Sequence, residues 1–227
     1  MAEATDNPEE KKAAENRLAL LTPIAKALMT ETGVEAAKHG MQVFGGHGYI
    51  AEHGMEQIAR DARIASLYEG TTEIQSIDLL ARKVLGSKLS LLTALTDEIQ
   101  GYVQENQQHA QFSQQVEQVR QLTEQWLTLT QTIQTQAQHS ANEIGAASVD
   151  YLFFSGYVVS AYLWLKMAVT AQQKIEAGDS DPFYAAKIKT AQFFFARILP
   201  RTATHIANIQ AGGESLFLLT PEEFKFD

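Results

Sequence analysis

Apolar positions recur at three- and four-residue spacing along most of the chain, which is the period of an α-helix that buries one face. The clearest run lies in the second half, where the positions between the apolar residues are mostly glutamine. This run predicts the seam of a helical bundle with a neutral, solvated outer face. Glutamine-rich sequence is also typical of prion-like segments, but the helical period favours the bundle. The seam consists of Phe112, Val116, Val119, Leu122, Trp126, Leu129, Ile133 and Ala137.

The first part of the sequence has the signals of two successive helices. Asn7, Pro8 and the acids that follow form a typical helix opening, and this helix is expected to run to about Leu21. A second helix is expected to open at Thr22–Pro23 and to end at the glycines Gly45 and Gly46. Its inward face would carry Ile24, Leu28, Val34, Ala37 and Met41.

Two shorter helices are expected after a glycine-rich loop at 45–54. The first runs from Met55 to Leu67, and Tyr68 to Thr71 breaks it. Thr71 or Thr72 then caps the next helix, which Gly86 and Ser87 end. The inward residues would be Met55, Ile58, Ala62 and Ala65 in the first helix, and Ile74, Ile77, Leu80 and Val84 in the second.

The remainder of the chain predicts four more helices, so we expect an all-α protein with two domains, 1–86 and 87–227. The second domain would be a four-helix bundle. Its last helix begins near Asp181–Pro182, bends at Pro200 and stops at Gly212–Gly213. The apolar stretch 151–169 approaches the length of a membrane span, but flanking charges and internal serine and glycine favour a buried central helix.

Composition narrows the class of protein. The 227 residues are 45% hydrophobic and 20% charged, an ordinary globular mixture. A net charge of -9 argues against nucleic acid or an anionic membrane as the main partner. The chain has no cysteine, so disulfides, thiolate metal sites and cysteine nucleophiles are excluded. No apolar signal-peptide region is visible between Met1 and Arg17, and we expect a soluble cytoplasmic protein.

Glu69 is the residue whose position stands out chemically. It lies at a helix break, between Tyr68 and Gly70 and just before a helix start. A carboxylate held there by backbone becomes a competent general base if apolar ligand surface excludes water. An ordinary capping acid would occupy the same position, and the residue alone does not decide between these interpretations. The three histidines His39, His47 and His53 match no common metal-ligand spacing, and no metal site is expected.

Three short motifs around Glu69 occur in a fixed order and spacing. They are Gln42-Val43-Phe44-Gly45-Gly46-His47-Gly48-Tyr49, Arg60-Asp61-Ala62-Arg63 and Tyr68-Glu69-Gly70-Thr71. In this order and spacing they resemble the C-terminal helical domain of acyl-CoA dehydrogenases. The sequence is also similar to the branch with an additional helical domain after the catalytic one, which would account for Lys88 onward.

The resemblance implies an FAD-dependent oxidoreductase of fatty acid β-oxidation. Glu69 would take the α-proton of an acyl-CoA while the β-hydrogen leaves as hydride to the flavin N5, which gives a trans-2-enoyl-CoA. Gly70 would leave room for the acyl chain, and Thr71 and Thr72 would approach the flavin pyrophosphate. The family also implies a homo-oligomer with an electron-transfer flavoprotein as electron acceptor. The segment Gln42, Val43, Phe44, Gly45 and Gly46 would contact the FAD of a neighbouring subunit.

Some features depart from the family pattern. Glu73 adds a negative charge close to the expected pyrophosphate, and Ala81 stands where glycine is common. Arg60 and Arg63 are expected to be structural, pairing with Asp61 or nearby acids. The N-terminal helical and middle β domains of the family are absent, so the chain is expected to be a fragment that is inactive alone. The alternative is a non-catalytic helical docking module derived from the dehydrogenase scaffold.

Overall fold

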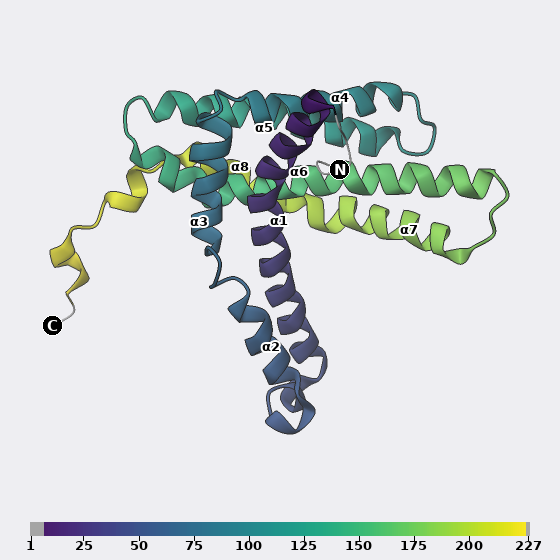
Figure 1. The fold of residues 1–227 in the computed structure, drawn as a ribbon. Coiled ribbons are helices and arrows are strands. Elements are labelled where there is room, and N and C mark those ends of the chain that lie inside the picture. The colour runs from purple at the N-terminus through teal and green to yellow at the C-terminus, as the bar shows by residue number, and fades with distance from the viewer. Residues whose placement is uncertain (1–6, 226–227) are drawn as a thin grey trace. The chain divides into compact units, whose positions relative to one another are not determined.

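A computed structural model describes residues 7–225 and shows helices joined by short turns, with no strand among these residues (Figure 1). The expected all-α class is confirmed. Residues 1–6 and 226–227, at the ends of the two expected domains, lie outside this described part. The chain divides into two compact units, Met1–Leu91 and Leu92–Asp227.

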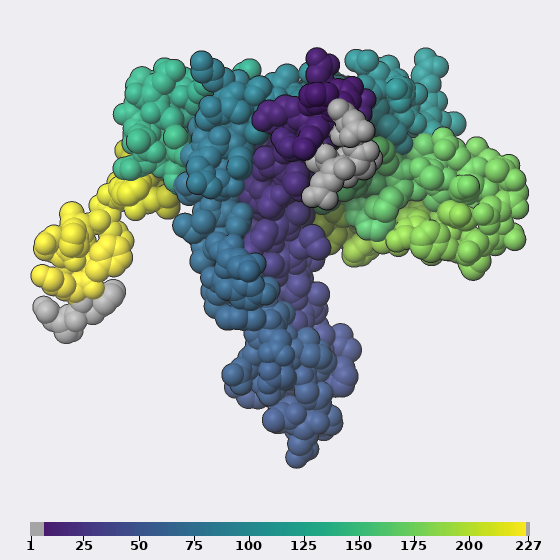
Figure 2. Space-filling model, in the orientation of Figure 1, coloured from purple at the N-terminus to yellow at the C-terminus, as the bar shows by residue number. Residues whose placement is uncertain are grey.

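The first unit is built on one long helix. It contains α1 (Pro8–Val43), the 3₁₀ turns η1 (Gly45–Gly48) and η2 (Ala51–His53), α2 (Met55–Ile64), α3 (Thr72–Ile77) and the π-helical η3 (Asp78–Leu85). Asn7 caps α1, because its Oδ1 accepts a hydrogen bond from the Glu9 N–H at 3.0 Å. The helices α2 and α3 both contact α1. In the space-filling view α1 and α2 form one continuous surface (Figure 2).

The prediction of two helices before Gly45 is wrong, because α1 continues through Pro23. Proline removes one backbone donor, which weakens a helix at that point without necessarily ending it. Here Leu20, Pro23 and Ile24 are all buried, so a continuous helix keeps one apolar face intact across the proline. The Thr22 hydroxyl also donates to the Leu18 carbonyl at 2.7 Å. Burial therefore outweighs the local signal for a break.

Three of the expected inward positions in the short helices are also wrong. Ile58 on α2 is 52% exposed, and Ile74 and Ile77 on α3 are 61% and 39% exposed. By contrast, Leu80 and Val84 are fully buried. Each short helix has α1 as a neighbour, and helical spacing predicts a face without saying whether another element covers it. The loop at 45–54 is not continuous coil either, since it forms the two 3₁₀ turns, and α2 ends at Ile64 instead of Leu67.

The second unit follows the expected helical bundle. Its elements are α4 (Ser90–Glu105), α5 (Ser113–Gln136), α6 (Asn142–Glu176), α7 (Pro182–Phe193), η4 (Phe194–Ile198), η5 (Leu199–Arg201), α8 (Thr202–Ala211), η6 (Glu214–Phe217) and η7 (Pro221–Phe224). The α-helical pattern is interrupted near Pro200 by the π-helical η4 and the 3₁₀ η5, so the predicted fourth helix is present as α7 and α8. Asp181 caps α7 by accepting from the Phe183 N–H at 2.9 Å.

The central helix α6 packs against α5, α7 and α8. Within the described residues it is the one helix long and apolar enough to cross a membrane, yet 61% of its most apolar window is buried inside the protein. This agrees with the expected buried central helix. The predicted α5 seam is largely confirmed, because six of its eight residues are buried: Phe112, Val116, Val119, Trp126, Leu129 and Ile133.

Candidate active site

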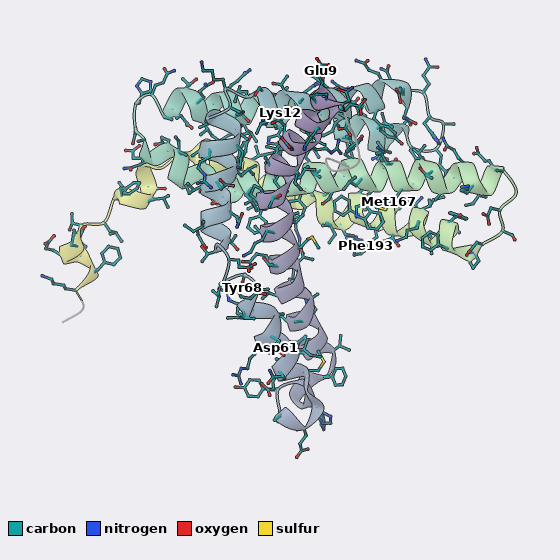
Figure 3. All side chains as sticks on the ribbon, in the orientation of Figure 1. Glu9, Lys12, Asp61, Tyr68, Met167 and Phe193 are labelled. Carbon is teal, nitrogen blue, oxygen red and sulfur yellow. The ribbon has the colours of Figure 1, made fainter. Side chains whose placement is uncertain are left out.

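The loop between α2 and α3 carries Glu69 in an uncommon backbone conformation. Glu69 has φ 53° and Gly70 has φ 88°, so two successive residues lie in the left-handed region. Glycine adopts this region freely, but a glutamate there costs roughly 1 kcal/mol or more. Figure 3 shows Tyr68 at this break between the two helices. A strained glutamate at a helix break needs neighbouring contacts that keep it in place.

Side chains hold the backbone on either side of Glu69. Gln75 Nε2 donates to the Glu69 carbonyl at 3.2 Å. Lys26 Nζ, from α1, donates to the Gly70 carbonyl at 2.6 Å. The Thr71 hydroxyl accepts from the Ile74 N–H at 3.4 Å and so caps α3, as predicted. Three consecutive residues of the loop are therefore anchored one by one.

A second set of contacts fixes the start of α3 against α1. The hydroxyl of Thr72, which is 5% exposed, donates to Glu31 Oε1 at 2.6 Å. The Arg63 guanidinium lies 3.8 Å from the same oxygen and donates to the Ser66 hydroxyl at 2.9 Å. The expected structural pairing holds for Arg63, but its partner is Glu31 on α1 and not Asp61, which accepts from Gln57.

The Glu69 carboxylate itself is exposed, and no hydrogen bond or ion pair from residues 7–225 reaches it. Its backbone is fixed while its charged end is free to meet a ligand. The loop favours glycine at position 70 because L side chains rarely adopt its φ of 88°, and a Cβ there would also displace Gln75 Nε2, which would lie 2.6 Å away. This arrangement suits a carboxylate that receives a proton from a molecule bound over the loop.

The segment predicted to contact a flavin lies far from Glu69 within one chain. Gln42 is sixteen residues beyond Lys26 on α1, which is about 24 Å along the helix axis. Val43 is 85% exposed and Phe44 is 51% exposed. The turn that follows is tight, since a Cβ on Gly48 would lie 2.3 Å from the Met41 carbonyl oxygen. The structure therefore does not bring 42–46 and Glu69 together in a single chain.

The fit of FAD to one chain is accordingly partial. The exposed apolar side chains and backbone at 42–46 fit contact with a planar aromatic group. At the α3 start, by contrast, the hydroxyls of Thr71 and Thr72 are already bonded within the chain. A contribution there to a pyrophosphate would have to come from backbone N–H groups.

Glu73 lies at this same helix start. Its pKa is lowered because its own backbone N–H and the Thr71 hydroxyl hydrogen-bond to the carboxylate, with a smaller contribution from the Arg63 charge. The expected extra negative charge is thus directed at the start of α3, where it would compete with an anionic ligand for the same N–H groups.

The sequence analysis did not predict the side chains that anchor this region, which are Lys26, Glu31 and Gln75. Lys26 and Glu31 are half-buried polar residues on α1, on the two turns that also carry the buried residues Ile24 and Ala27. Polar residues beside a predicted apolar stripe were the available signal, but their partners are more than forty residues away in sequence. In residues 7–225 no group of three or more histidine or acidic side chains could hold a metal ion.

The comparisons with known proteins cover nearly the whole chain. The family described as "Acyl-CoA dehydrogenase, C-terminal domain" matches residues 2–85, and "Acetyl-CoA dehydrogenase C-terminal like" matches residues 95–220. A 3-methylmercaptopropionyl-CoA dehydrogenase of Ruegeria pomeroyi is 33% identical over 94% of this chain and 37% of its own length. A broad-specificity linear acyl-CoA dehydrogenase of Mycobacterium tuberculosis is 30% identical over 80% of this chain and 31% of its own length.

A butyryl-CoA dehydrogenase of Syntrophomonas wolfei is 25% identical over 88% of this chain and 33% of its own length. The chain thus spans about a third of the length of these relatives. The two family matches follow one another along the sequence and together leave few residues uncovered. The chain belongs to the acyl-CoA dehydrogenase family, and it corresponds to the C-terminal helical portion of its members.

Proposed function

We propose that this chain is the C-terminal portion of an FAD-dependent acyl-CoA dehydrogenase that converts an acyl-CoA into a trans-2-enoyl-CoA in fatty acid β-oxidation. The observation that carries the proposal is the Glu69 loop, in which the backbone is anchored at three consecutive residues and the carboxylate is free. FAD, when bound, supplies the acceptor for the hydride that leaves the β-carbon.

Glu69 is the residue to which we assign the proton transfer. Its carboxylate takes the α-proton of the thioester. When the acyl chain is bound it excludes water from the carboxylate, and this loss of solvation makes the carboxylate a stronger base. Gly70 and the left-handed turn let the backbone approach the acyl group without an intervening side chain. The backbone N–H of Glu69 is available to hydrogen-bond the thioester carbonyl oxygen as negative charge develops on it.

We assign the Gln42–Gly46 segment to the flavin site of a second subunit. The separation of about 24 Å from Lys26 supports this division, because one chain presents its base and this segment on distant surfaces. The protein is then a homo-oligomer whose sites are shared between subunits. An electron-transfer flavoprotein is the proposed physiological acceptor of the electrons, on the basis of the family resemblance.

An anaerobic absorbance titration tests the proposed function. The completed enzyme, in which the N-terminal helical and middle domains precede this chain, should bleach its flavin when an acyl-CoA is added. Glu69→Gln should slow bleaching by about 10²- to 10⁴-fold, because a neutral amide cannot take the proton. Glu105→Gln, at an exposed glutamate of α4, is the matched control and should bleach at the wild-type rate.

The same titration addresses the non-catalytic docking module. The observation that favours docking is the exposed apolar surface of the first unit, including Val43 and Met29, which is 71% exposed. The 227-residue chain alone is expected not to bleach FAD under either proposal. Wild-type bleaching in the Glu69→Gln form of the completed enzyme would contradict the assignment of Glu69 as the base.

A further inference from the structure

One cationic side chain reaches the loop beside Glu69 from outside the loop. Lys26 lies on α1, forty-four residues before Gly70, and its ammonium group donates to the Gly70 carbonyl at 2.6 Å. This is a short, charge-assisted hydrogen bond, a class roughly twice as strong as a bond between neutral groups. The Lys26 side chain is half-buried, so the contact is less screened than one on an open surface.

We propose that Lys26 is a positioning residue for Glu69, which sets where the carboxylate stands by holding the peptide that follows it. This inference rests on the proposed function of Glu69 as the base. Lys26 does not touch the reacting atoms, and it acts through the carbonyl of Gly70. The proposal concerns the geometry of the loop and leaves the chemistry of the base itself unchanged.

The left-handed backbone at Glu69 explains why such an anchor is needed. A glutamate at φ 53° relaxes toward negative φ unless its neighbours prevent it. Rotation about the Glu69 and Gly70 backbone would swing the Gly70 carbonyl away from Lys26 and would re-aim the Glu69 side chain. The hydrogen bond to Lys26 therefore opposes the motion that would misplace the carboxylate.

The other anchors differ from Lys26 in origin. Gln75 belongs to α3, which immediately follows the loop. Its 3.2 Å hydrogen bond to the Glu69 carbonyl therefore joins the loop only to the adjacent segment of chain. Lys26 belongs to a helix of 36 residues and ties the loop to a rigid element. A site is held more accurately by groups on a rigid element than by groups that move with it.

Glu31 provides a second contact from α1 to the segment that follows Glu69. It lies five residues further along the helix, about 7.5 Å along the axis, and accepts the Thr72 hydroxyl at 2.6 Å. Lys26 and Glu31 thus hold Gly70 in the loop and Thr72, the first residue of α3. A shift of the loop by one residue along α1 would break both contacts.

The first arm of the test measures backbone order in the 227-residue chain. The ¹⁵N order parameters of Glu69 and Gly70 should be about 0.85 in the wild type and should fall below about 0.6 in Lys26→Met, which keeps the side-chain length but loses the donor. Lys26→Arg retains a cationic donor and should restore order. Lys38→Met, at an exposed lysine of the same helix, is the matched control and should match the wild type.

The second arm uses the completed enzyme with FAD and an acyl-CoA. Lys26→Met should lower kcat by about tenfold to a hundredfold while KM changes by less than about threefold, because a base displaced by about 1 Å loses rate more than binding. Lys26→Arg should recover most of the loss. A circular dichroism spectrum equal to wild type confirms that the variant is folded.

The positioning role of Lys26 and the role of Glu69 as the base fail on different results. Wild-type order parameters in Lys26→Met would overturn the positioning role, as would a disordered loop with unchanged kcat. If Glu69→Gln keeps wild-type turnover, the assignment of the base fails, and the effect of Lys26 on loop order is still read directly from the first arm.

Discussion

The Glu69 loop of the first unit and the α5–α6 pair of the second unit are held together by different forces. Around Glu69, side chains of Lys26 and Gln75 bond backbone carbonyls, and the residue itself is exposed. Between α5 and α6, fully buried apolar side chains make the contact. The polar bond there, from Tyr151 to the Thr130 hydroxyl at 2.7 Å, is completely enclosed. Burial raises the pKa of Tyr151, so its hydroxyl stays protonated.

The two regions meet different structural requirements. The α5–α6 pair gains stability from excluded water and close packing, which need no further partner. In the loop, directional hydrogen bonds hold the backbone in one orientation, and the Glu69 carboxylate stays accessible to a ligand. The surface around it also carries large exposed apolar side chains, which in isolation lack the contacts of a core: Ile64, Leu67, Tyr68, Ile74 and Ile77. Such a surface is typical of a site that another domain, subunit or ligand completes.

The largest expected effect comes from the core of the second unit. Trp126→Ala removes a fully buried indole from α5 and should lower the free energy of unfolding by about 3–5 kcal/mol. Phe193→Ala, at an aromatic residue of α7 that is 59% exposed, is the control and should cost less than about 0.5 kcal/mol. Urea unfolding followed by circular dichroism measures both. Equal losses would mean that the α5 seam is not the centre of this core.

A smaller loss is expected at the polar contact between α6 and α8. Asp150 Oδ1 lies 2.7 Å from His205 Nδ1 and accepts from Asn208 Nδ2 at 3.1 Å, while the rings of Phe153 and Tyr157 stack on His205. Asp150→Ala leaves two polar groups without their acceptor and should cost about 1–3 kcal/mol in urea unfolding.

The control for that variant is Asp97→Ala, at an exposed aspartate of α4. It should change the free energy of unfolding by less than about 0.5 kcal/mol. If Asp150→Ala were as mild as Asp97→Ala, the contact with His205 would not contribute to stability.

The Glu69 loop should respond to backbone changes more than to loss of apolar volume. Gly70→Ala places a Cβ 2.6 Å from Gln75 Nε2 at φ 88° and should destabilise the folded state by about 1–2 kcal/mol. Gly33→Ala, on α1, meets nothing within 4 Å and should instead stabilise the helix by up to about 1 kcal/mol. The two thermal midpoints should therefore move in opposite directions. A common sign would show that the left-handed φ at Gly70 is not a constraint.

The smallest effect is a pH dependence at Glu73. Its folded pKa lies below the ordinary value of 4.5, so the ionised carboxylate stabilises the folded state above that value, and this contribution is lost as the pH falls through the folded pKa. Because the side chain is largely exposed, we expect only a few tenths of a kcal/mol. The stability difference between wild type and Glu73→Gln should be measurable near neutral pH and should shrink as the pH falls below the ordinary value of 4.5 and through the lowered folded pKa. A difference that persists in acid would exclude this origin.

The sequence predicted the fold well where burial is periodic and local. The α5 seam, the capping by Asn7 and Thr71, and the start of α7 near Asp181 all follow from residues within a few positions of each other. It failed at Pro23, where a local signal for a helix start was outweighed by burial on one side of α1. It also failed at Ile58, Ile74 and Ile77, because an apolar face does not reveal whether a neighbour covers it.

The candidate site was predicted in part. Motif spacing located Glu69, Gly70 and the 42–46 segment, and their proposed roles stay predictions. The anchors Lys26 and Glu31 were missed because their contacts join residues more than forty positions apart. The left-handed conformation of Glu69 was also beyond the sequence, since glutamate gives no sign of it.

Local sequence patterns were enough to predict that the chain is helical, where α1, α2, α3 and α7 begin, and which acid stands at the break before α3. These features depend on spacing and on side chains that act on their own backbone. The tertiary structure alone decided that α1 runs unbroken past Pro23 and that an α1 ammonium group holds the carbonyl beside Glu69. Such contacts are set by packing between distant segments, which no local pattern encodes.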